Sequence, residues 1–238
     1  MNSGDKILTE NANWSFKGSV VKKFDGHISK SVPLYETTHE LYLNLSDFFL
    51  MDKSKIIDIG CSTGTFLNKI YLRHDKNKID KKIYYQGYDN VKEMISFAKK
   101  KNKLNRINFY NKDIEKINFS NSAIISSFYT IQFINPKKRQ LIINKIFKGL
   151  NWGGAFFMVE KVRGPDARFQ DYLTHIYNDY KLSQGYSKEE IFSKSMSLKG
   201  ILEPFSTKGN TDMLKRAGFK DIIIIFKYGC FEGYLAIK

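Results

Sequence analysis

The sequence contains little cysteine and no long hydrophobic run. Only Cys61 and Cys230 occur among 238 residues, and neither lies in a C-x-x-C motif or a histidine-rich cluster, which argues against a disulfide framework and a structural zinc site. No stretch of about 18 or more apolar residues is present, so we expect no membrane-spanning helix. Residues 1–10 lack the apolar core of a signal peptide. These absences predict a protein of the reducing cytoplasm, with no metal ion and no membrane partner.

Internal repeats and low-complexity linkers are also absent, and the composition is that of a folded protein. Hydrophobic residues make up 42% of the chain and aromatic residues 15%, which excludes a disordered chain. A length of 238 residues is sufficient for one sizeable hydrophobic core. We therefore predict a single domain over residues 1–238.

The net charge of +15 is the strongest compositional signal for a partner. Such an excess of positive charge can indicate an anionic partner such as RNA. However, the lysines are spread along the chain, and lysine, asparagine and isoleucine are all heavily used, as in proteins from AT-rich genomes. Charge alone therefore permits binding to nucleic acid without favouring it.

Residues 55–67 are the stretch around which the rest of the chain is organised. Three isoleucines favour a short buried strand, Gly60 and Gly64 bracket a turn, and a helix begins near residue 66. Glycine tolerates positive φ and lets the backbone approach a ligand, and we expect Thr63 or Thr65 to cap the helix. Strand, glycine turn and helix N-terminus form a cofactor cradle in open α/β sheets. The alternative is an ordinary turn, because the G-x-x-x-G spacing is not that of dinucleotide sites.

Two further predicted strands end in acidic residues. Residues 83–89 end at Asp89, which is placed to accept hydrogen bonds from a ribose diol. Residues 107–114 contain Asp113 near their end. Gly60, Asp89 and Asp113 would then line one edge of a sheet. This spacing is typical of an S-adenosylmethionine site, with the methionine moiety at the first loop, the ribose at the second strand and the adenine near the third.

Strands and helices alternate over the first two thirds of the chain. This alternation predicts a parallel sheet with helices on both faces, and the last two strands must pair antiparallel because no helix separates them. The expected fold is therefore α/β and Rossmann-like, of class I methyltransferase type, with a mostly parallel seven-stranded sheet and an antiparallel C-terminal hairpin. The expected strands are 55–59, 83–89, 107–113, 123–129, 155–159, 222–226 and 233–237, and the main helices are 36–50, 66–73, 90–101, 137–150 and 211–217.

The helical pattern also predicts which side chains share a face. In the helix at 36–50 the apolar face would carry Leu41, Leu45, Phe48 and Phe49, and in the helix at 137–150 it would carry Leu141, Ile142, Ile146 and Phe147. Residues 151–154, Asn-Trp-Gly-Gly, are expected to form a turn before the fifth strand.

Two segments fall outside the alternating pattern. Residues 1–50 are expected to form an N-terminal lid over the cofactor loop followed by a helix, and Pro33 disfavours helix at Val32. Residues 163–205 contain no clear strand. They predict an aromatic-faced helix and, after a capping box that begins at Ser187, a second helix. In a doubly wound fold such an insertion lies above the strand ends, so we expect it to form a substrate wall, a dimer contact or both.

Short motifs carry a closer match than the fold does. The most specific are D-I-G-C-S at residues 58–62 and S-V-P-L-Y at residues 31–35. With them, the chain resembles the carboxy-S-adenosylmethionine synthase family, relatives of methyltransferases that serve wobble-uridine modification in tRNA. Further matching segments are 14–16, 89–90, 113–114, 130–133, 149–154, 160–161, 185–187 and 217–219. The resemblance implies that the S-adenosylmethionine contacts are Tyr35, Gly60, Cys61, Ser62, Asp89, Asn90, Asp113 and Ile114.

Two positions depart from the family pattern. The resemblance implies an arginine that grips the extra carboxylate of the carboxylated cofactor, and the ungapped alignment puts Ser195 there. A serine cannot supply the bidentate fork of a guanidinium, although Lys194 beside it carries a charge. The family also has an asparagine where this chain has Phe128. We infer that the S-adenosylmethionine site is kept, whereas the site for the carboxylated product is open to question.

Three functions are compatible with these observations. The first is an S-adenosylmethionine-dependent methyltransferase acting on a small, anionic acceptor, for which Arg163, Arg168 and Lys194 are candidate contacts. The second, implied by the resemblance, is the synthesis of carboxy-S-adenosylmethionine with prephenate as the carboxyl donor. The third is a tRNA-binding protein or tRNA methyltransferase. The family suggests a homodimer. No residue is assigned as catalytic, because each of the four histidines fits a structural or surface role better, as His27 and His175 illustrate.

Overall fold

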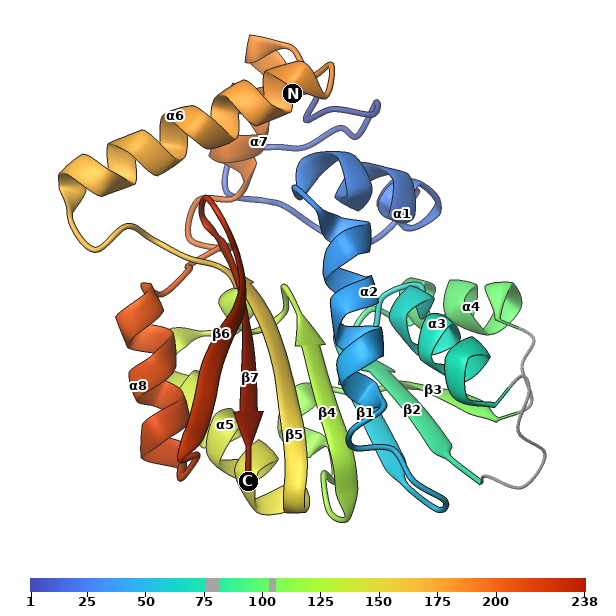
Figure 1. Ribbon diagram of the computed structural model, residues 1–238. Coiled ribbons are helices and arrows are strands. Elements are labelled where there is room, and N and C mark those ends of the chain that lie inside the picture. Colours follow the sequence, from blue (N-terminus) through green and yellow to red (C-terminus); the bar gives the residue numbers. More distant parts are fainter. Residues whose placement is uncertain (76–81, 103–105) are drawn as a thin grey trace.

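A computed structural model (Figure 1) describes residues 1–75, 82–102 and 106–238. Within these residues seven strands form one sheet: β1 (Lys55–Ile59), β2 (Tyr84–Asp89), β3 (Ile107–Asn111), β4 (Ser122–Phe128), β5 (Leu150–Lys161), β6 (Asp221–Tyr228) and β7 (Phe231–Ile237). Their order is β3-β2-β1-β4-β5-β7-β6. The first five strands pair in parallel, and β7 pairs antiparallel with both β5 and β6. The predicted sheet is thereby confirmed. The predicted charged connection at 75–82 lies largely outside the described residues.

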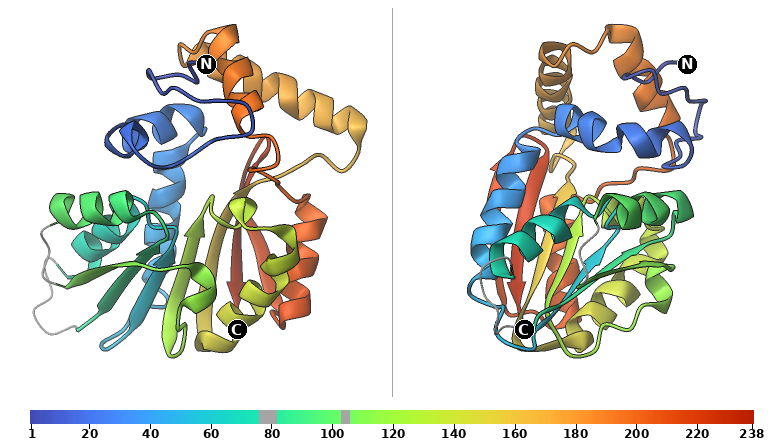
Figure 2. Two further views of the ribbon diagram at one scale, coloured as in Figure 1. Left: turned by 180° about the vertical axis from the view of Figure 1, so that it is seen from behind. Right: turned by 90° about the vertical axis from the view of Figure 1, so that its right-hand side faces the viewer.

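Helices cover both faces of this sheet: α2 (Tyr35–Ser46), α3 (Thr65–His74), α4 (Lys92–Lys101), α5 (Pro136–Gly149) and α8 (Thr207–Ala217). On one face Ile56 of β1 packs in a cluster with side chains of α2, α3 and α4. On the other face its neighbour Ile57 packs in a cluster with side chains of α5 and α8. The side view in Figure 2 shows the two helical layers. Burial on both faces explains why the central strands are apolar at successive positions.

The buried face of α2 differs from the one that the leucine pattern predicted. Leu41 and Leu45 are only partly buried, Phe48 is exposed beyond the helix end, and Tyr42 is fully buried instead. The hydroxyl of Tyr42 donates to the backbone carbonyl of Tyr234 in β7 at 2.9 Å. Because the polar tip is satisfied, the ring can occupy a core position.

In α5 a residue predicted to be buried is exposed, and a charged residue is buried instead. Leu141 is 54% exposed, whereas Arg139 is 2% exposed. The guanidinium of Arg139 donates to the backbone carbonyls of Gln132, Ile134 and Glu203. Burial of a charge is tolerated when each donor finds an acceptor, so the prediction for Leu141 was wrong for a reason that periodicity does not reveal.

Two local predictions were also wrong. Neither Thr63 nor Thr65 caps α3, because Gly64 occupies the N-cap position with φ of 76°. Both threonine hydroxyls instead hydrogen-bond to the carboxylate of Asp25. Residues 151–154 form the first part of β5 rather than a separate turn, with a register shift against β4 in this region.

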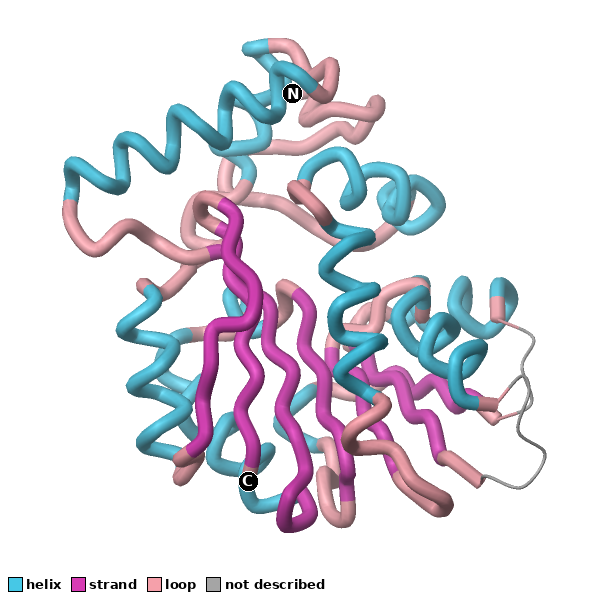
Figure 3. The backbone as a smooth tube through the Cα atoms, viewed as in Figure 1, coloured by secondary structure: helices cyan, strands magenta, loops and turns pink. Residues whose placement is uncertain are grey.

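A layer of helix and loop lies above the carboxyl ends of the parallel strands (Figures 1 and 3). It consists of residues 1–18, α1 (Ser19–Ser31), α6 (Ala167–Ser183) and α7 (Lys188–Ser197). The segment 20–35, which was expected to form part of the lid, is mostly helical. Its helix α1 ends where Val32 becomes extended before Pro33, as predicted. The predicted capping box at the start of α7 is also confirmed.

Part of the aromatic face of α6 is exposed, although Leu173 and Tyr177 pack against the core. No residue of α6 is buried, and Phe169, Tyr172 and Ile176 are each about half exposed. In the part of the chain that the structure describes, no helix is long and apolar enough to cross a bilayer.

Candidate functional site

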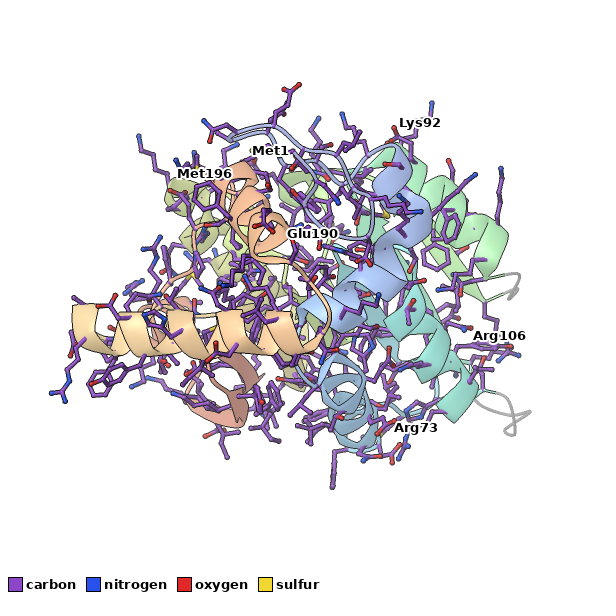
Figure 4. All side chains as sticks on the ribbon, turned by 90° about the horizontal axis from the view of Figure 1, so that it is seen from above. Met1, Arg73, Lys92, Arg106, Glu190 and Met196 are labelled. Atoms are coloured by element: carbon purple, nitrogen blue, oxygen red, sulfur yellow. The ribbon has the colours of Figure 1, made fainter. Side chains whose placement is uncertain are left out.

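A cavity of about 480 Å³ lies between the strand ends and the upper layer. It is lined by the loop after β1, the end of β2, the start of α2, and side chains of α1, α6 and α7. The view from above in Figure 4 shows these upper helices across the sheet edge. The volume falls within the range of roughly 300–1,000 Å³ that is typical of small-molecule sites.

The glycine loop forms the floor of this cavity. Gly60 has φ of 66°, and a Cβ atom built there would lie 2.2 Å from Oγ1 of Thr130. The amides of Gly60 and Cys61 both donate to the carbonyl of Tyr88 at the end of β2, at 2.8 and 3.1 Å. Only glycine satisfies both the left-handed backbone and the close approach, so the loop is held in one conformation at the strand ends.

Asp89 links the glycine loop to the end of β2. Its carboxylate accepts hydrogen bonds from the amides of Ser62 and Val91, at 3.0 and 2.8 Å. Burial raises the pKa of Asp89, and the two amide hydrogen bonds oppose that rise. Each carboxylate oxygen retains a free lone pair, so Asp89 can accept further hydrogen bonds from ligand hydroxyls in the cavity.

A second carboxyl, Asp58, also lines the cavity and was not among the predicted site residues. It is 3% exposed, and the hydroxyl of Ser126 donates to it at 2.8 Å. Burial raises the pKa of Asp58 to about 7, partly opposed by the Ser126 hydrogen bond. The sequence does place this acid inside an otherwise apolar strand, which is the signal that could have identified it.

The structure brings most of the predicted ligand contacts together. Seven of the eight predicted contacts are among the residues that line the cavity: Tyr35, Gly60, Cys61, Ser62, Asp89, Asn90 and Ile114. Asp113 is not among the lining residues. It is exposed, and its carboxylate accepts a hydrogen bond from the amide of Glu115 at 2.8 Å as the cap of a short 3-10 helix. The reason is that β3 ends at Asn111, two residues earlier than expected.

The three predicted substrate contacts do not all line the cavity. Lys194 of α7 lines the cavity and also a second hollow between α6 and α7, whereas Arg163 lines only the second hollow. Arg168 lines neither, and its Nε donates to the hydroxyl of Tyr172 at 3.0 Å. Ser195, the position at which the family pattern implies an arginine, is exposed and borders the second hollow.

Lys194 is held in a chain of polar contacts that joins three segments. Its Nζ lies 3.4 Å from Nε2 of His27, and Nδ1 of His27 lies 2.7 Å from the carboxylate of Asp5. The same Nζ lies 2.6 Å from the ring centroid of Trp14. Burial lowers the pKa of Lys194 well below its usual range. Asp5 and His27, which sequence reasoning did not assign to the site, thus set the position of this ammonium.

Two further lysines at the cavity wall were missed by the sequence analysis. The Nζ atoms of Lys161 at the end of β5 and of Lys181 on α6 each lie 4.4 Å from the ring centroid of Tyr177. The spacing of four residues between Tyr177 and Lys181 places them on one helix face, which is the signal that could have linked them. Lys161 could not have been added, because its contact with Tyr177 depends on how α6 packs over the sheet.

His39 lines the cavity but is not equipped to act as a base. Its ring is 1% exposed and packs against Tyr35, Phe66 and Phe128, at centroid distances of 4.4, 5.3 and 4.9 Å. Neither ring nitrogen has a hydrogen-bond partner among the described residues. Burial lowers the pKa of His39 to about 3, so the ring is neutral at physiological pH.

Comparison with known proteins gives the same fold and a narrower family. The model of the methyltransferase domain family matches residues 50–215. A carboxy-S-adenosyl-L-methionine synthase from Staphylococcus epidermidis is 36% identical over 226 residues, which cover 94% of this chain and 97% of that protein. Proteins of the same name from Campylobacter lari and Nautilia profundicola are each 37% identical. The Campylobacter match covers 94% of both chains, and the Nautilia match covers 98% of this chain and 99% of that protein.

The chain belongs to the carboxy-S-adenosyl-L-methionine synthase family. Solved structures support the fold. A protein from Methanococcus maripaludis, described as a putative S-adenosyl-L-methionine-dependent methyltransferase, has a TM-score of 0.61 at 18% identity and covers 97% of both chains. Human N-acetylserotonin methyltransferase in complex with SAM has a TM-score of 0.58 at 16% identity, over 86% of this chain and 52% of that one. The class I methyltransferase fold and an S-adenosylmethionine-dependent transferase are therefore confirmed.

Glu160 supports the cavity floor from below. Its two carboxylate oxygens accept hydrogen bonds from the amides of Ile131 and Gln132, each at 2.9 Å, and the side chain is fully buried. We expect Glu160→Gln to lower the free energy of unfolding by about 1–3 kcal/mol, because an amide NH₂ would face a buried N–H donor. Denaturant unfolding measures this change. Glu203→Gln, at an exposed carboxylate, is the control, and equal stability of the two variants would contradict the assignment.

Proposed function

We propose that the chain synthesises carboxy-S-adenosylmethionine from S-adenosylmethionine and prephenate. The observation that carries the proposal is that one cavity joins the glycine loop and Asp89 to the cationic side chains of Lys161, Lys181 and Lys194. A nucleoside cofactor and an anionic substrate would therefore meet in the same enclosed space. The names of the curated relatives favour this reaction over the small-molecule methyltransferase that the sequence first suggested.

The nucleoside end fits S-adenosylmethionine by its own geometry. A Cβ at Gly60 would meet the side chain of Thr130, so only glycine lets the loop keep this position, in which its backbone would face the amino acid portion. Asp89 is buried and retains acceptor capacity for the two ribose hydroxyls. Tyr35 and Ile114 supply apolar wall to either side. When bound, S-adenosylmethionine supplies an activated one-carbon group on a sulfonium.

In this proposal the residues of the chain bind, orient and exclude water. Ser62 and Asn90 lie beside Asp89 at the nucleoside end, whereas the aromatic side chains of Trp14 and Phe16 close the cavity from the upper layer. Exclusion of water strengthens charge interactions inside the site. Within about 3–3.5 Å, correct placement of the reacting carbon atoms supplies most of the required rate enhancement.

Mass spectrometry of the nucleoside products tests the proposed reaction. The protein is incubated with S-adenosylmethionine and prephenate, with each substrate omitted in turn as a control. We expect a carboxylated nucleoside only when both are present. S-adenosylhomocysteine without a carboxylated product would contradict the proposal and favour methyl transfer.

The apparent affinity for prephenate should depend on pH through Lys181. Burial and the charge of Lys161 lower the pKa of Lys181 to about 8. Because the carboxylates of prephenate stay ionised, the change with rising pH comes from loss of the lysine proton. We expect KM for prephenate to be constant below about pH 7 and to rise roughly tenfold per pH unit above pH 8.

Lys161, Lys194, Tyr177 and Cys230 are the other titratable groups that face or surround Lys181. Lys181→Arg should therefore shift the rise in KM to higher pH, whereas an unchanged profile would contradict the role of this lysine. A homodimer, for which the exposed aromatic face of α6 is the candidate surface, and binding to tRNA stay predictions.

A further inference from the structure

Three lysines face the cavity without a negative partner. Lys161, Lys181 and Lys194 all line it, and none forms an ion pair with a carboxylate in the ranges 1–75, 82–102 and 106–238. Burying like charges together is unfavourable unless an anion neutralises them. Burial lowers the pKa of both Lys181 and Lys194, and a smaller effect of the same sign comes from the charge of Lys161 on Lys181 and that of Lys181 on Lys194. The arrangement thus favours a ligand that brings its own negative charge.

The ring of Tyr177 lies beside the first two of these lysines. Both Nζ atoms lie 4.4 Å from its centroid, a distance at which ammonium groups are attracted to an aromatic face. The hydroxyl of Tyr177 donates to the backbone carbonyl of Ser31 at 2.8 Å, so α1 holds the ring in place. Lys161 comes from β5 and Lys181 from α6, and the pair therefore forms only in the folded chain.

Lys194 forms a separate cationic position that is built differently. It rests on the ring of Trp14 and contacts Nε2 of His27, while Asp5 accepts a hydrogen bond from Nδ1 of the same imidazole. Tyr186 donates to the same Asp5 oxygen at 2.9 Å. Burial and the nearby charge of Lys194 lower the pKa of His27, which favours the neutral imidazole. The cavity therefore offers two cationic positions, one formed by two lysines and one by a single lysine.

We propose that these two positions select a substrate with two carboxylates: the Lys161–Lys181 pair binds one and Lys194 binds the other. The inference rests on the proposed function, because the site it describes would bind prephenate, but it concerns recognition and not turnover. In the family pattern an arginine at position 195 would bind a carboxylate. Here Lys161, Lys181 and Lys194 would do so instead. The aromatic rings of Trp14 and Tyr177, against which the cations rest, favour a ligand that carries an apolar ring in addition to its two carboxylates.

A comparison of the binding affinities of two matched ligands tests the proposal without turnover. Phenylsuccinate and 3-phenylpropionate share a phenyl ring and differ chiefly by one carboxylate. Calorimetric titration of the protein saturated with S-adenosylmethionine should give at least tenfold tighter binding of phenylsuccinate. Equal affinity for the two ligands would overturn the proposal.

Substitutions then separate the two positions. Lys194→Met should bring the affinity ratio of the two ligands close to one. Lys161→Met or Lys181→Met should weaken both ligands at least tenfold, and Lys181→Arg should retain binding. Lys220→Met, at an exposed lysine that follows α8 and lines neither hollow, is the matched control and should behave as the parent protein.

Calorimetry with S-adenosylmethionine alone reports whether each variant keeps its fold and nucleoside site, and we expect its affinity to change less than twofold. Dicarboxylate selectivity without formation of a carboxylated nucleoside would contradict the proposed function and leave the subsite intact. Formation of that product with unchanged KM for prephenate in the lysine variants would overturn the subsite.

Discussion

Replacing Gly60 by alanine should abolish detectable binding of S-adenosylmethionine. The residue has φ of 66°, and an added Cβ would lie 2.2 Å from Oγ1 and 2.7 Å from Cγ2 of Thr130. The left-handed conformation alone costs an L-residue about 1–2 kcal/mol, and overpacking adds about 1–3 kcal/mol. The side chain of Thr130 cannot move freely, because its hydroxyl donates to the carbonyls of Ile59 and Phe128. The loop must therefore shift, and the backbone that forms the cavity floor shifts with it.

Gly153→Ala provides the matched control for this substitution. Gly153 has a similar φ of 73°, but an added Cβ would meet no atom within 4 Å, and the residue lies in β5 away from the cavity lining. Both variants therefore pay for backbone strain, and only Gly60→Ala also distorts the site. Calorimetric titration should show parent-like affinity for Gly153→Ala and no measurable heat for Gly60→Ala. Parent-like binding by Gly60→Ala would refute the role of this loop.

Replacing Asp89 by alanine should weaken S-adenosylmethionine binding by at least a hundredfold. The carboxylate accepts the amide hydrogen bonds of Ser62 and Val91, and in the proposed site it also accepts hydrogen bonds from the ribose. Hydrogen bonds to a charged group contribute about 1.5–3 kcal/mol each, and losing those to the ribose accounts for the expected change. The released amide of Ser62 would further loosen the glycine loop.

Asp113→Ala distinguishes a ligand contact from an acid near a strand end. Sequence reasoning treats Asp89 and Asp113 alike, but the structure places Asp113 at an exposed helix cap outside the cavity lining. Equilibrium dialysis with labelled S-adenosylmethionine should give parent-like affinity for Asp113→Ala. If both alanine variants lost binding equally, the cavity would have been assigned to the wrong strand ends.

The sheet and the position of Gly60 and Asp89 at one cavity could be predicted because their signals are local. The D-I-G-C-S segment contains a strand, a turn and the residues of the loop within a few positions, and Asp89 follows directly on a strand. In parallel strands the carboxyl ends meet at one edge, so a short pattern is enough to bring Gly60 and Asp89 together. Asp113 is not among the residues that line the cavity, because β3 ends two residues earlier than expected.

The substrate end could not be predicted in the same way, because its contacts join distant segments. Lys194 is positioned by His27, which is 167 residues away in sequence, and His27 in turn by Asp5. Lys161 and Lys181 become a pair only when α6 packs over the end of β5. The apolar faces of α2 and α5 failed for a related reason, since hydrogen bonds to remote backbone groups allowed Tyr42 and Arg139 to replace leucines in the core.

A crystal structure of the protein with S-adenosylmethionine and phenylsuccinate tests the central claim most directly. We predict nucleoside density against the Gly60 loop with its ribose hydroxyls on Asp89, and a dicarboxylate between Lys194 and the Lys161–Lys181 pair in the same cavity. Nucleoside density in the second hollow beside Arg163, or side chains that fill the edge between Gly60 and Asp89, would contradict it.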